Sequence, residues 1–314
     1  MKWKVMISAP YMQPVIDRFM DIFSAHDIEL TIPPVMERME EDELLEWIGD
    51  VDGAICGDDR FSEKVLRSAP KLKVISKWGT GIDSIDRVCC QKLNIAVCNT
   101  PNAFSEPVAD SVMGYILCFA RKLPWMDIDM HKGCWDKIPG RALRECTLGI
   151  VGVGNVGKAV ARRAASFGMN LVGSDPMRMP EEFLAVTRIR MMSTHELLRL
   201  ADFVSLNCDL NPTSFHLIEA RAIALMKPSA IIINTARGPI IDEPALIDAL
   251  RAKQIAGAAL DVFENEPLSV DNPLCRMSNV MMAPHNANSS PEAWEHVHRN
   301  SINNLIDVLE RSSQ

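Results

Sequence analysis

Three polar residues that could carry out proton and carboxylate chemistry each follow an apolar, strand-like run. Arg237, Glu266 and His285 are these residues. Because the carboxyl ends of parallel strands meet at one edge of an open sheet, we expect the three side chains to converge there. An arginine fork can hold a carboxylate and polarise a carbonyl group. A histidine oriented by a carboxylate can exchange a proton near neutral pH, so the three residues predict a catalytic site.

A glycine-rich segment upstream has the pattern of a dinucleotide-binding loop. The apolar run 147–151 leads directly into three glycines, and apolar residues then recur at helical spacing. Glycine permits the tight turn, the approach of a pyrophosphate and the packing of helix on strand. The amides at the helix start and the positive end of its dipole favour phosphates. The predicted contacts are Gly152, Gly154, Asn155, Val156 and Gly157.

An acidic residue follows the next strand-like run at the distance expected for recognition of a ribose. Asp175 directly follows the run 170–174. Its carboxylate would accept hydrogen bonds from the ribose hydroxyls and repel a 2′-phosphate, so NAD is favoured over NADP. Arg178 lies close enough to weaken this preference.

The elements that position these residues alternate along the chain. Strand-like runs at 4–8, 53–56, 73–76 and 96–98 are separated by helical patterns, and the alternation resumes at Thr147 and continues to about Met282. Such alternation predicts parallel sheets covered by helices. A helical period also occurs over 102–121 and 291–311. The length of 314 residues favours two domains.

Several segments, in the same order, resemble the D-2-hydroxyacid dehydrogenase family, and within it the phosphoglycerate dehydrogenase-like branch. The matching segments are 77–83, 99–102, the glycine loop, 234–238, 260–267 and Pro284-His285. The resemblance implies an α/β fold of two Rossmann-like, doubly wound parallel-sheet domains. An NAD-binding domain, residues 101–284, would be inserted in a substrate domain formed by residues 1–100 and 285–314.

The resemblance also implies roles for single residues. Arg237 would bind substrate, His285 would be the acid/base and Glu266 its partner. Taken alone, Arg237 could form a salt bridge at a helix start and Glu266 could be a surface acid before a proline. Further NAD contacts would come from Cys208, Thr235, Ala236 and Asp261. Further substrate contacts would come from Lys77, Trp78, Gly79, Thr80, Gly81 and Asn102, with the backbone of 79–81 cradling a carboxylate. Asp209, Asn286 and Asn288 depart from the family's pattern, which affects the expected substrate more than the reaction.

The substrate prediction depends on whether a positively charged side chain is available to bind a phosphate group of the substrate. We favour a 3-phosphoglycerate-like substrate, because Lys77 or Arg60 could supply that charge. Alternatively Lys77 extends into solvent, as lysines usually do, and the substrate is glyoxylate, hydroxypyruvate or another unphosphorylated 2-oxoacid. A more distant alternative is a dinucleotide-sensing binding protein like the C-terminal-binding corepressors, which share the fold.

Composition limits the partners and the compartment. The net charge of −8 argues against nucleic acid and anionic membrane surfaces. We find no apolar run long enough to span a bilayer, and the nine cysteines contain no C-x-x-C pair, so a reducing cytoplasm is predicted. Trp125, Met126, Met130 and Trp135, within 123–140, predict an arm that packs on a second subunit of a homodimer. The remaining histidines show no ligand-like spacing, and no metal site is predicted.

Overall fold

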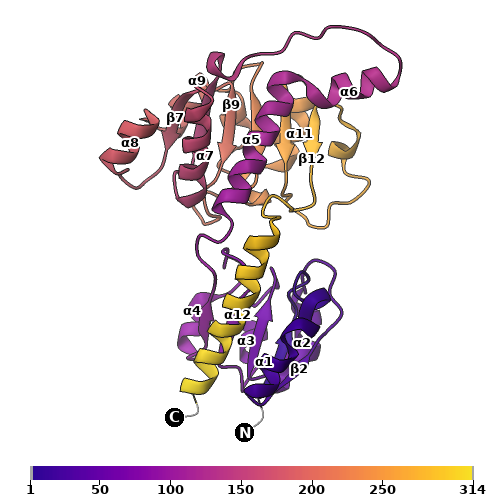
Figure 1. The fold of residues 1–314 in the computed structure, drawn as a ribbon, viewed down its shortest axis with the longest axis vertical. Coiled ribbons are helices and arrows are strands. Elements are labelled where there is room, and N and C mark those ends of the chain that lie inside the picture. The colour runs from indigo at the N-terminus through magenta and orange to yellow at the C-terminus, as the bar shows by residue number, and fades with distance from the viewer. Residues whose placement is uncertain (1–2, 313–314) are drawn as a thin grey trace. The chain divides into compact units, whose positions relative to one another are not determined.

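The structure is a computed structural model that describes residues 3–312, which form two compact units (Figure 1). The first unit comprises residues 3–104 and 290–312, and the second comprises residues 105–289. Each unit contains one parallel sheet covered by helices. The predicted fold class is therefore confirmed: two doubly wound parallel-sheet units, one inserted in the chain of the other.

The sheet of the first unit has the strand order β2-β1-β3-β4-β5. Its strands are β1 (Trp3–Ile7), β2 (Ile28–Thr31), β3 (Gly53–Cys56), β4 (Val74–Lys77) and β5 (Ala96–Cys98). The helical elements are η1 (Gln13–Phe19), α1 (Met20–Ala25), α2 (Glu41–Trp47), η2 (Ile48–Asp50), α3 (Glu63–Arg67), α4 (Arg87–Lys92) and α12 (Pro291–Arg311). Strand β2 was not expected from the sequence, because it is a short edge strand in which only Ile28 is buried.

Helix α12 covers the strands β3, β4 and β5 of this sheet, as Figure 1 shows in yellow. It begins where Ser290 caps the first turn, its side chain accepting a hydrogen bond from the amide of Ala293. Val297, Ile302 and Leu305 recur at helical spacing and are fully buried. The predicted helix over 291–311 thus closes the core of the first unit.

The sheet of the second unit has the strand order β12-β11-β10-β9-β6-β7-β8. Its strands are β6 (Thr147–Val151), β7 (Asn170–Ser174), β8 (Arg190–Met191), β9 (Phe203–Leu206), β10 (Ile231–Asn234), β11 (Gly257–Leu260) and β12 (Val280–Met282). The helical elements are α5 (Ser105–Arg121), α6 (Leu123–His131), η3 (Leu143–Glu145), α7 (Asn155–Ser166), α8 (Glu181–Thr187), α9 (Thr194–Leu200), α10 (Ala220–Ile223), η4 (Gly238–Ile240), α11 (Glu243–Arg251) and η5 (Pro273–Arg276).

Helices cover both faces of this sheet. Helices α5 and α7 pack side by side on one face (Figure 1), where Ile116, Val160 and Ile150 share a core. Helices α9, α10 and α11 contribute to a second core with Val204 and Ile232. Because both faces are buried, the central strands are continuously apolar, which is why they could be recognised in the sequence.

The strand order reverses between β6 and β9, and the loops that follow these two strands meet. A β-carbon added to Gly152, after β6, would lie 2.5 Å from the backbone nitrogen of Cys208, after β9. In open α/β sheets, ligands bind in the crevice at such a reversal.

The segment that was expected to form an arm is only partly exposed. Trp125, in α6, packs on Phe119 with 5.0 Å between ring centroids and donates a hydrogen bond to the carbonyl of Ser278. Trp125, which is partly buried, therefore packs against the core of its own unit, whereas the prediction placed it against a second subunit. Trp135 has 79% of its surface exposed, and Met130 is also exposed. None of the helices within residues 3–312 has the length and apolar character needed to cross a membrane.

Candidate active site

The three glycines of the loop after β6 meet different surroundings. Gly152 has φ +85°, and a β-carbon on Gly157 would lie 2.1 Å from the carbonyl oxygen of Gly152. The first and third glycines are therefore required by the protein's own packing. A β-carbon on Gly154 would meet no atom within 4 Å. The second position thus leaves the backbone open to a bound group.

The helix that follows presents an uncapped N-terminus at this open position. Gly154 is the N-cap of α7, and no side chain of the described residues caps it. Val156 packs on the core, whereas Asn155 is exposed. Amide groups at such a helix start, together with the helix dipole, suit a pyrophosphate.

Asp175 is anchored beside the same loop. Its carboxylate accepts hydrogen bonds from the amide of Val153 at 2.7 Å and from the amide of Met177 at 2.8 Å. A carboxylate has about four lone-pair positions, so two of them remain for ribose hydroxyls. Arg178 forms a 3.2 Å ion pair with Glu181 and is exposed. Asp175 and Arg178 line an open depression of about 470 Å³.

The loops after β9 and β10 complete this edge of the sheet. Burial raises the pKa of the Cys208 thiol to about 11, so this side chain is neutral near pH 7. The hydroxyl of Thr235 is buried and has no hydrogen-bond partner within residues 3–312. Buried polar groups are normally paired, so this hydroxyl suits a ligand. This hydroxyl and the open backbone at Gly154 fit a bound dinucleotide.

Arg237 is held in place by a buried asparagine at the end of β10. The side chain of Asn234 accepts a hydrogen bond from the amide of Ala236 at 3.1 Å and donates one to the carbonyl of Arg237 at 2.9 Å. The next residue is Gly238, whose β-carbon, if present, would lie 1.9 Å from the carbonyl oxygen of Phe263. The segment that carries Arg237 therefore lies against the segment that carries Glu266.

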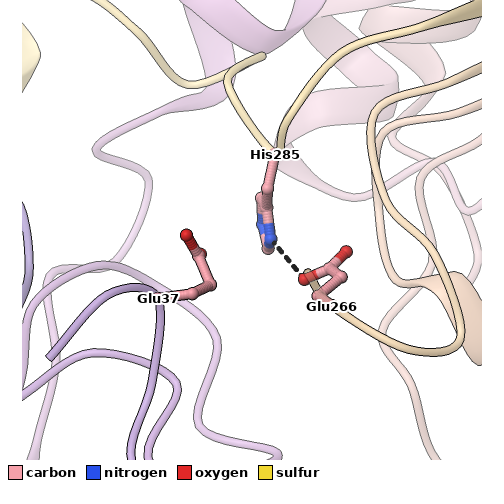
Figure 2. A group of neighbouring side chains, drawn as sticks. All are labelled: Glu37, Glu266 and His285. Carbon is pink, nitrogen blue, oxygen red and sulfur yellow. Dashed lines mark hydrogen bonds and ion pairs between the residues drawn. The ribbon is translucent and has the colours of Figure 1, made fainter. Parts of the chain in front are cut away.

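His285 and Glu266 form a hydrogen-bonded pair, drawn in Figure 2. His285 Nδ1 lies 3.0 Å from Oε2 of Glu266, and both side chains are partly buried. The other carboxylate oxygen, Oε1, accepts a hydrogen bond from the amide of Phe263 at 2.8 Å. This second bond fixes the carboxylate so that it can orient the imidazole ring. Glu37, also drawn in Figure 2, belongs to the other unit.

Asp261, an expected NAD contact, shapes the loop that carries His285. Its buried carboxylate accepts hydrogen bonds from the amides of Asn286 at 2.9 Å and Ala287 at 2.8 Å. Its carbonyl accepts another from the amide of His285, which has φ +50°. Burial raises the pKa of this carboxyl above its usual range. This contact of Asp261 with the His285 loop was not predicted from the sequence.

The expected substrate residues of the first unit surround the end of β4. Gly79 has φ +126° and accepts a hydrogen bond from the amide of Thr100. The hydroxyl of Thr80 donates to the carbonyl of Thr100 at 2.9 Å. Asn102 has φ +61°. Gly81, which is partly exposed, directly follows Thr80.

Lys77 and Trp78 are both buried. Lys77 is only 4% exposed, and its Nζ lies 3.1 Å from a carboxylate oxygen of Asp58. The alternative in which Lys77 extends into solvent is therefore wrong. The indole of Trp78 donates a hydrogen bond to Nδ1 of His298 at 2.9 Å. Arg60, the other candidate cation, is half exposed and lies 3.9 Å from Glu40.

The comparison with protein families identifies the second unit. Residues 113–287 match the family described as D-isomer specific 2-hydroxyacid dehydrogenase, NAD binding domain. The chain belongs to the D-2-hydroxyacid dehydrogenase family. The predicted family and the predicted cofactor, NAD, are confirmed, and so is the prediction of an NAD-dependent dehydrogenase. The absence of a metal site remains a prediction.

The similar proteins are named as different enzymes of the family. A D-3-phosphoglycerate dehydrogenase of Methanocaldococcus jannaschii is 41% identical over 263 residues, which cover 82% of this chain but 50% of that protein. A glyoxylate reductase of Thermofilum pendens is 38% identical over 275 residues, or 85% of this chain and 81% of the relative. The structure of a D-lactate dehydrogenase from Aquifex aeolicus, complexed with NAD and lactic acid, is 25% identical with a TM-score of 0.88 and covers 98% of this chain and 95% of that one.

Proposed function

We propose that this protein uses NADH to reduce an unphosphorylated 2-oxoacid to a D-2-hydroxyacid, and that it catalyses the reverse reaction with NAD. The observation that carries the proposal is the hydrogen bond between His285 and the anchored carboxylate of Glu266. When bound, NADH supplies the hydride for the carbonyl carbon of the substrate. The protein's own side chains must then supply the proton and bind the substrate.

Each of the three predicted catalytic residues has a distinct role in this proposal. With Nδ1 hydrogen-bonded to Glu266, His285 would donate the proton from Nε2 to the developing alkoxide oxygen. Glu266 holds the orientation of the imidazole ring. Arg237 binds the substrate carboxylate and polarises the adjacent carbonyl group.

The first unit, by the same proposal, is the substrate domain, and the backbone of Gly79 to Gly81 contributes to carboxylate binding. The ion pair of Lys77 with Asp58 favours an unphosphorylated substrate over the 3-phosphoglycerate-like one expected from the sequence. A phosphate needs an available positive charge, and that of Lys77 is already balanced by Asp58. Glyoxylate and hydroxypyruvate need no such charge.

A steady-state screen tests the proposal. NADH oxidation is followed with glyoxylate, hydroxypyruvate, pyruvate and 3-phosphohydroxypyruvate, for the unaltered protein and for Asp58→Asn. We expect turnover of an unphosphorylated acid by the unaltered protein. Asp58→Asn releases the charge of Lys77, so it should improve kcat/KM for the phosphorylated substrate relative to glyoxylate. A clear preference of the unaltered protein for 3-phosphohydroxypyruvate would contradict the substrate proposal, and NADH binding without any turnover would favour a dinucleotide-sensing binding protein.

We further propose that the protein is a cytoplasmic homodimer. The exposed Trp135 and Met130 support an interface, because large exposed apolar side chains are typical of contact surfaces. All nine cysteines are free, which agrees with a reducing compartment. Light scattering on the unaltered protein and on Trp135→Ser tests the dimer: a monomeric unaltered protein would contradict it.

A further inference from the structure

The loop after β11 contributes the glutamate of a second histidine–glutamate pair. His216 Nε2 lies 2.8 Å from Oε1 of Glu264, and Glu264 is two residues before Glu266. Their side chains are 34% and 24% exposed, so the pair is partly shielded from water. One short loop thus engages two histidines, His285 through Glu266 and His216 through Glu264.

His216 also contacts the segment that carries Arg237. Its backbone nitrogen donates a 2.8 Å hydrogen bond to the carbonyl of Pro239, two residues beyond Arg237. The backbone of His216 has φ +49°. Residues 218 and 241 continue this contact as a parallel bridge. His216 therefore joins the loop after β10 through its backbone and the loop after β11 through its side chain.

His216 and Glu264 are each fixed by further contacts. The ring of Phe215 stacks on the ring of His216, with centroids 4.0 Å apart and an angle of 16°. Glu264 Oε1 also accepts a hydrogen bond from the amide of Glu243 at 3.2 Å, at the start of α11. Glu243 accepts one in turn from the amide of Glu264 at 3.2 Å, and Asn272 donates to Glu243 at 2.8 Å. A hydrogen bond within such a network has little freedom to shift.

We propose that His216 is a positioning residue for the reaction, which aligns Arg237 with the Glu266–His285 pair. This inference rests on the proposed function of those three residues. His216 lies outside them in the sequence and acts only through the loops that carry them. Loss of its side chain would let the loop after β11 move relative to the loop after β10. Misplacement of Glu266 then lowers kcat, and misplacement relative to Arg237 raises KM for the oxoacid.

Two substitutions at residue 216 separate the hydrogen bond from the bulk of the ring. His216→Phe keeps a ring that can stack on Phe215 but cannot donate a hydrogen bond. His216→Gln keeps an amide N–H group near the position of Nε2. We expect His216→Phe to lower kcat/KM for the oxoacid about tenfold or more, with a raised KM. His216→Gln should stay within about threefold of the unaltered enzyme, and NADH binding should be unchanged in both variants.

A matched pair on the surface of the first unit provides the control. His26 Nδ1 lies 2.7 Å from Glu310, so His26→Phe removes the same kind of interaction in the unit that does not carry the predicted catalytic trio. A purely structural loss lowers the amount of active protein and leaves KM unchanged, so KM decides between the two roles. Equal kinetics for His216→Phe and the unaltered enzyme, or an equal loss in His216→Gln or His26→Phe, would overturn the inference. No turnover by the unaltered protein would instead overturn the proposed function, and the inference with it.

Discussion

Gly238 and Phe263 approach so closely that only glycine fits at residue 238. A β-carbon there would lie 1.9 Å from the carbonyl oxygen of Phe263 and 2.5 Å from the amide nitrogen of Glu264. These contacts are with backbone atoms, which cannot move aside as a flexible side chain can. The close approach brings the segment of Arg237 against the segment of Glu266, and the proposed chemistry depends on this alignment.

Replacement of Gly238 by alanine should therefore separate the two segments. We expect Gly238→Ala to lower kcat/KM by at least about tenfold and to destabilise the fold by about 1–3 kcal/mol. Gly114→Ala is the control: a β-carbon at this exposed position in α5 meets no atom within 4 Å. It should stabilise the helix by about 0.5–1 kcal/mol and leave activity unchanged. Thermal unfolding and steady-state assays measure both; similar results for the two variants would contradict this account.

Gly154 should matter for the cofactor and little for the fold. Gly154→Ser introduces a side chain into the open space beside α7 and retains a good N-cap residue. We expect the Kd for NADH, measured by fluorescence titration, to rise more than about tenfold while Tm changes little. Unchanged NADH affinity would show that the pyrophosphate does not pass over this glycine.

Asp175 should set the preference for NADH over NADPH. Asp175→Asn removes the charge that would repel a 2′-phosphate, while an amide oxygen can still accept a hydrogen bond from Val153. The ratio of kcat/KM for NADH to that for NADPH should fall on the order of tenfold. The exposed Arg178 would then be available to the phosphate. If the unaltered protein used both cofactors equally well, Asp175 would not be the selecting residue.

A buried acid in the first unit should make stability depend on pH. Burial raises the pKa of Asp59 from 3.8 to about 6, although Ser8 and the amide of Met39 donate hydrogen bonds to it. Between these two values the folded state holds a proton that the unfolded chain has released. Stability should therefore fall as pH rises through this range, by about 3 kcal/mol from this group.

Asp59→Asn removes that titration and keeps oxygen and nitrogen atoms for both partners. The difference in unfolding free energy between the Asp59→Asn variant and the unaltered protein should grow in favour of the variant from about pH 4 to pH 6. Denaturant unfolding at several pH values measures it. A difference that does not change with pH would show that Asp59 is ionised throughout this range.

The strand ends were predictable from the sequence, and the partners that cross between loops were not. Apolar runs before Gly152, Asp175 and Arg237 mark strands of a sheet that is buried on both faces, so the glycine loop and the edge of the second sheet could be located. The pairing of His285 with Glu266 was expected from their places beyond strand-like runs and from the resemblance, and the structure shows their contact at 3.0 Å.

Other contacts join residues whose spacing in the sequence follows neither the helical nor the strand period. His216 and Glu264 are 48 residues apart, and nothing in the spacing connects them. Lys77 is the last residue of β4 and Asp58 lies just beyond the end of β3, and only the register of β3 against β4 brings them together. Trp125 stands among polar residues in the sequence, so packing inside its own unit was not expected. In the structure it packs on Phe119 and donates a hydrogen bond to the carbonyl of Ser278. Such tertiary contacts decide whether a charge or an aromatic ring is available to a ligand.

The most direct test of the central claim compares His285→Asn with the unaltered protein in the reduction of an unphosphorylated 2-oxoacid by NADH. Asparagine can still hydrogen-bond to Glu266 but cannot donate the proton. We predict that kcat falls by about 10² to 10⁴ while the Kd for NADH changes little. Turnover by His285→Asn near that of the unaltered enzyme would contradict the account, because His285 would then not be the proton donor.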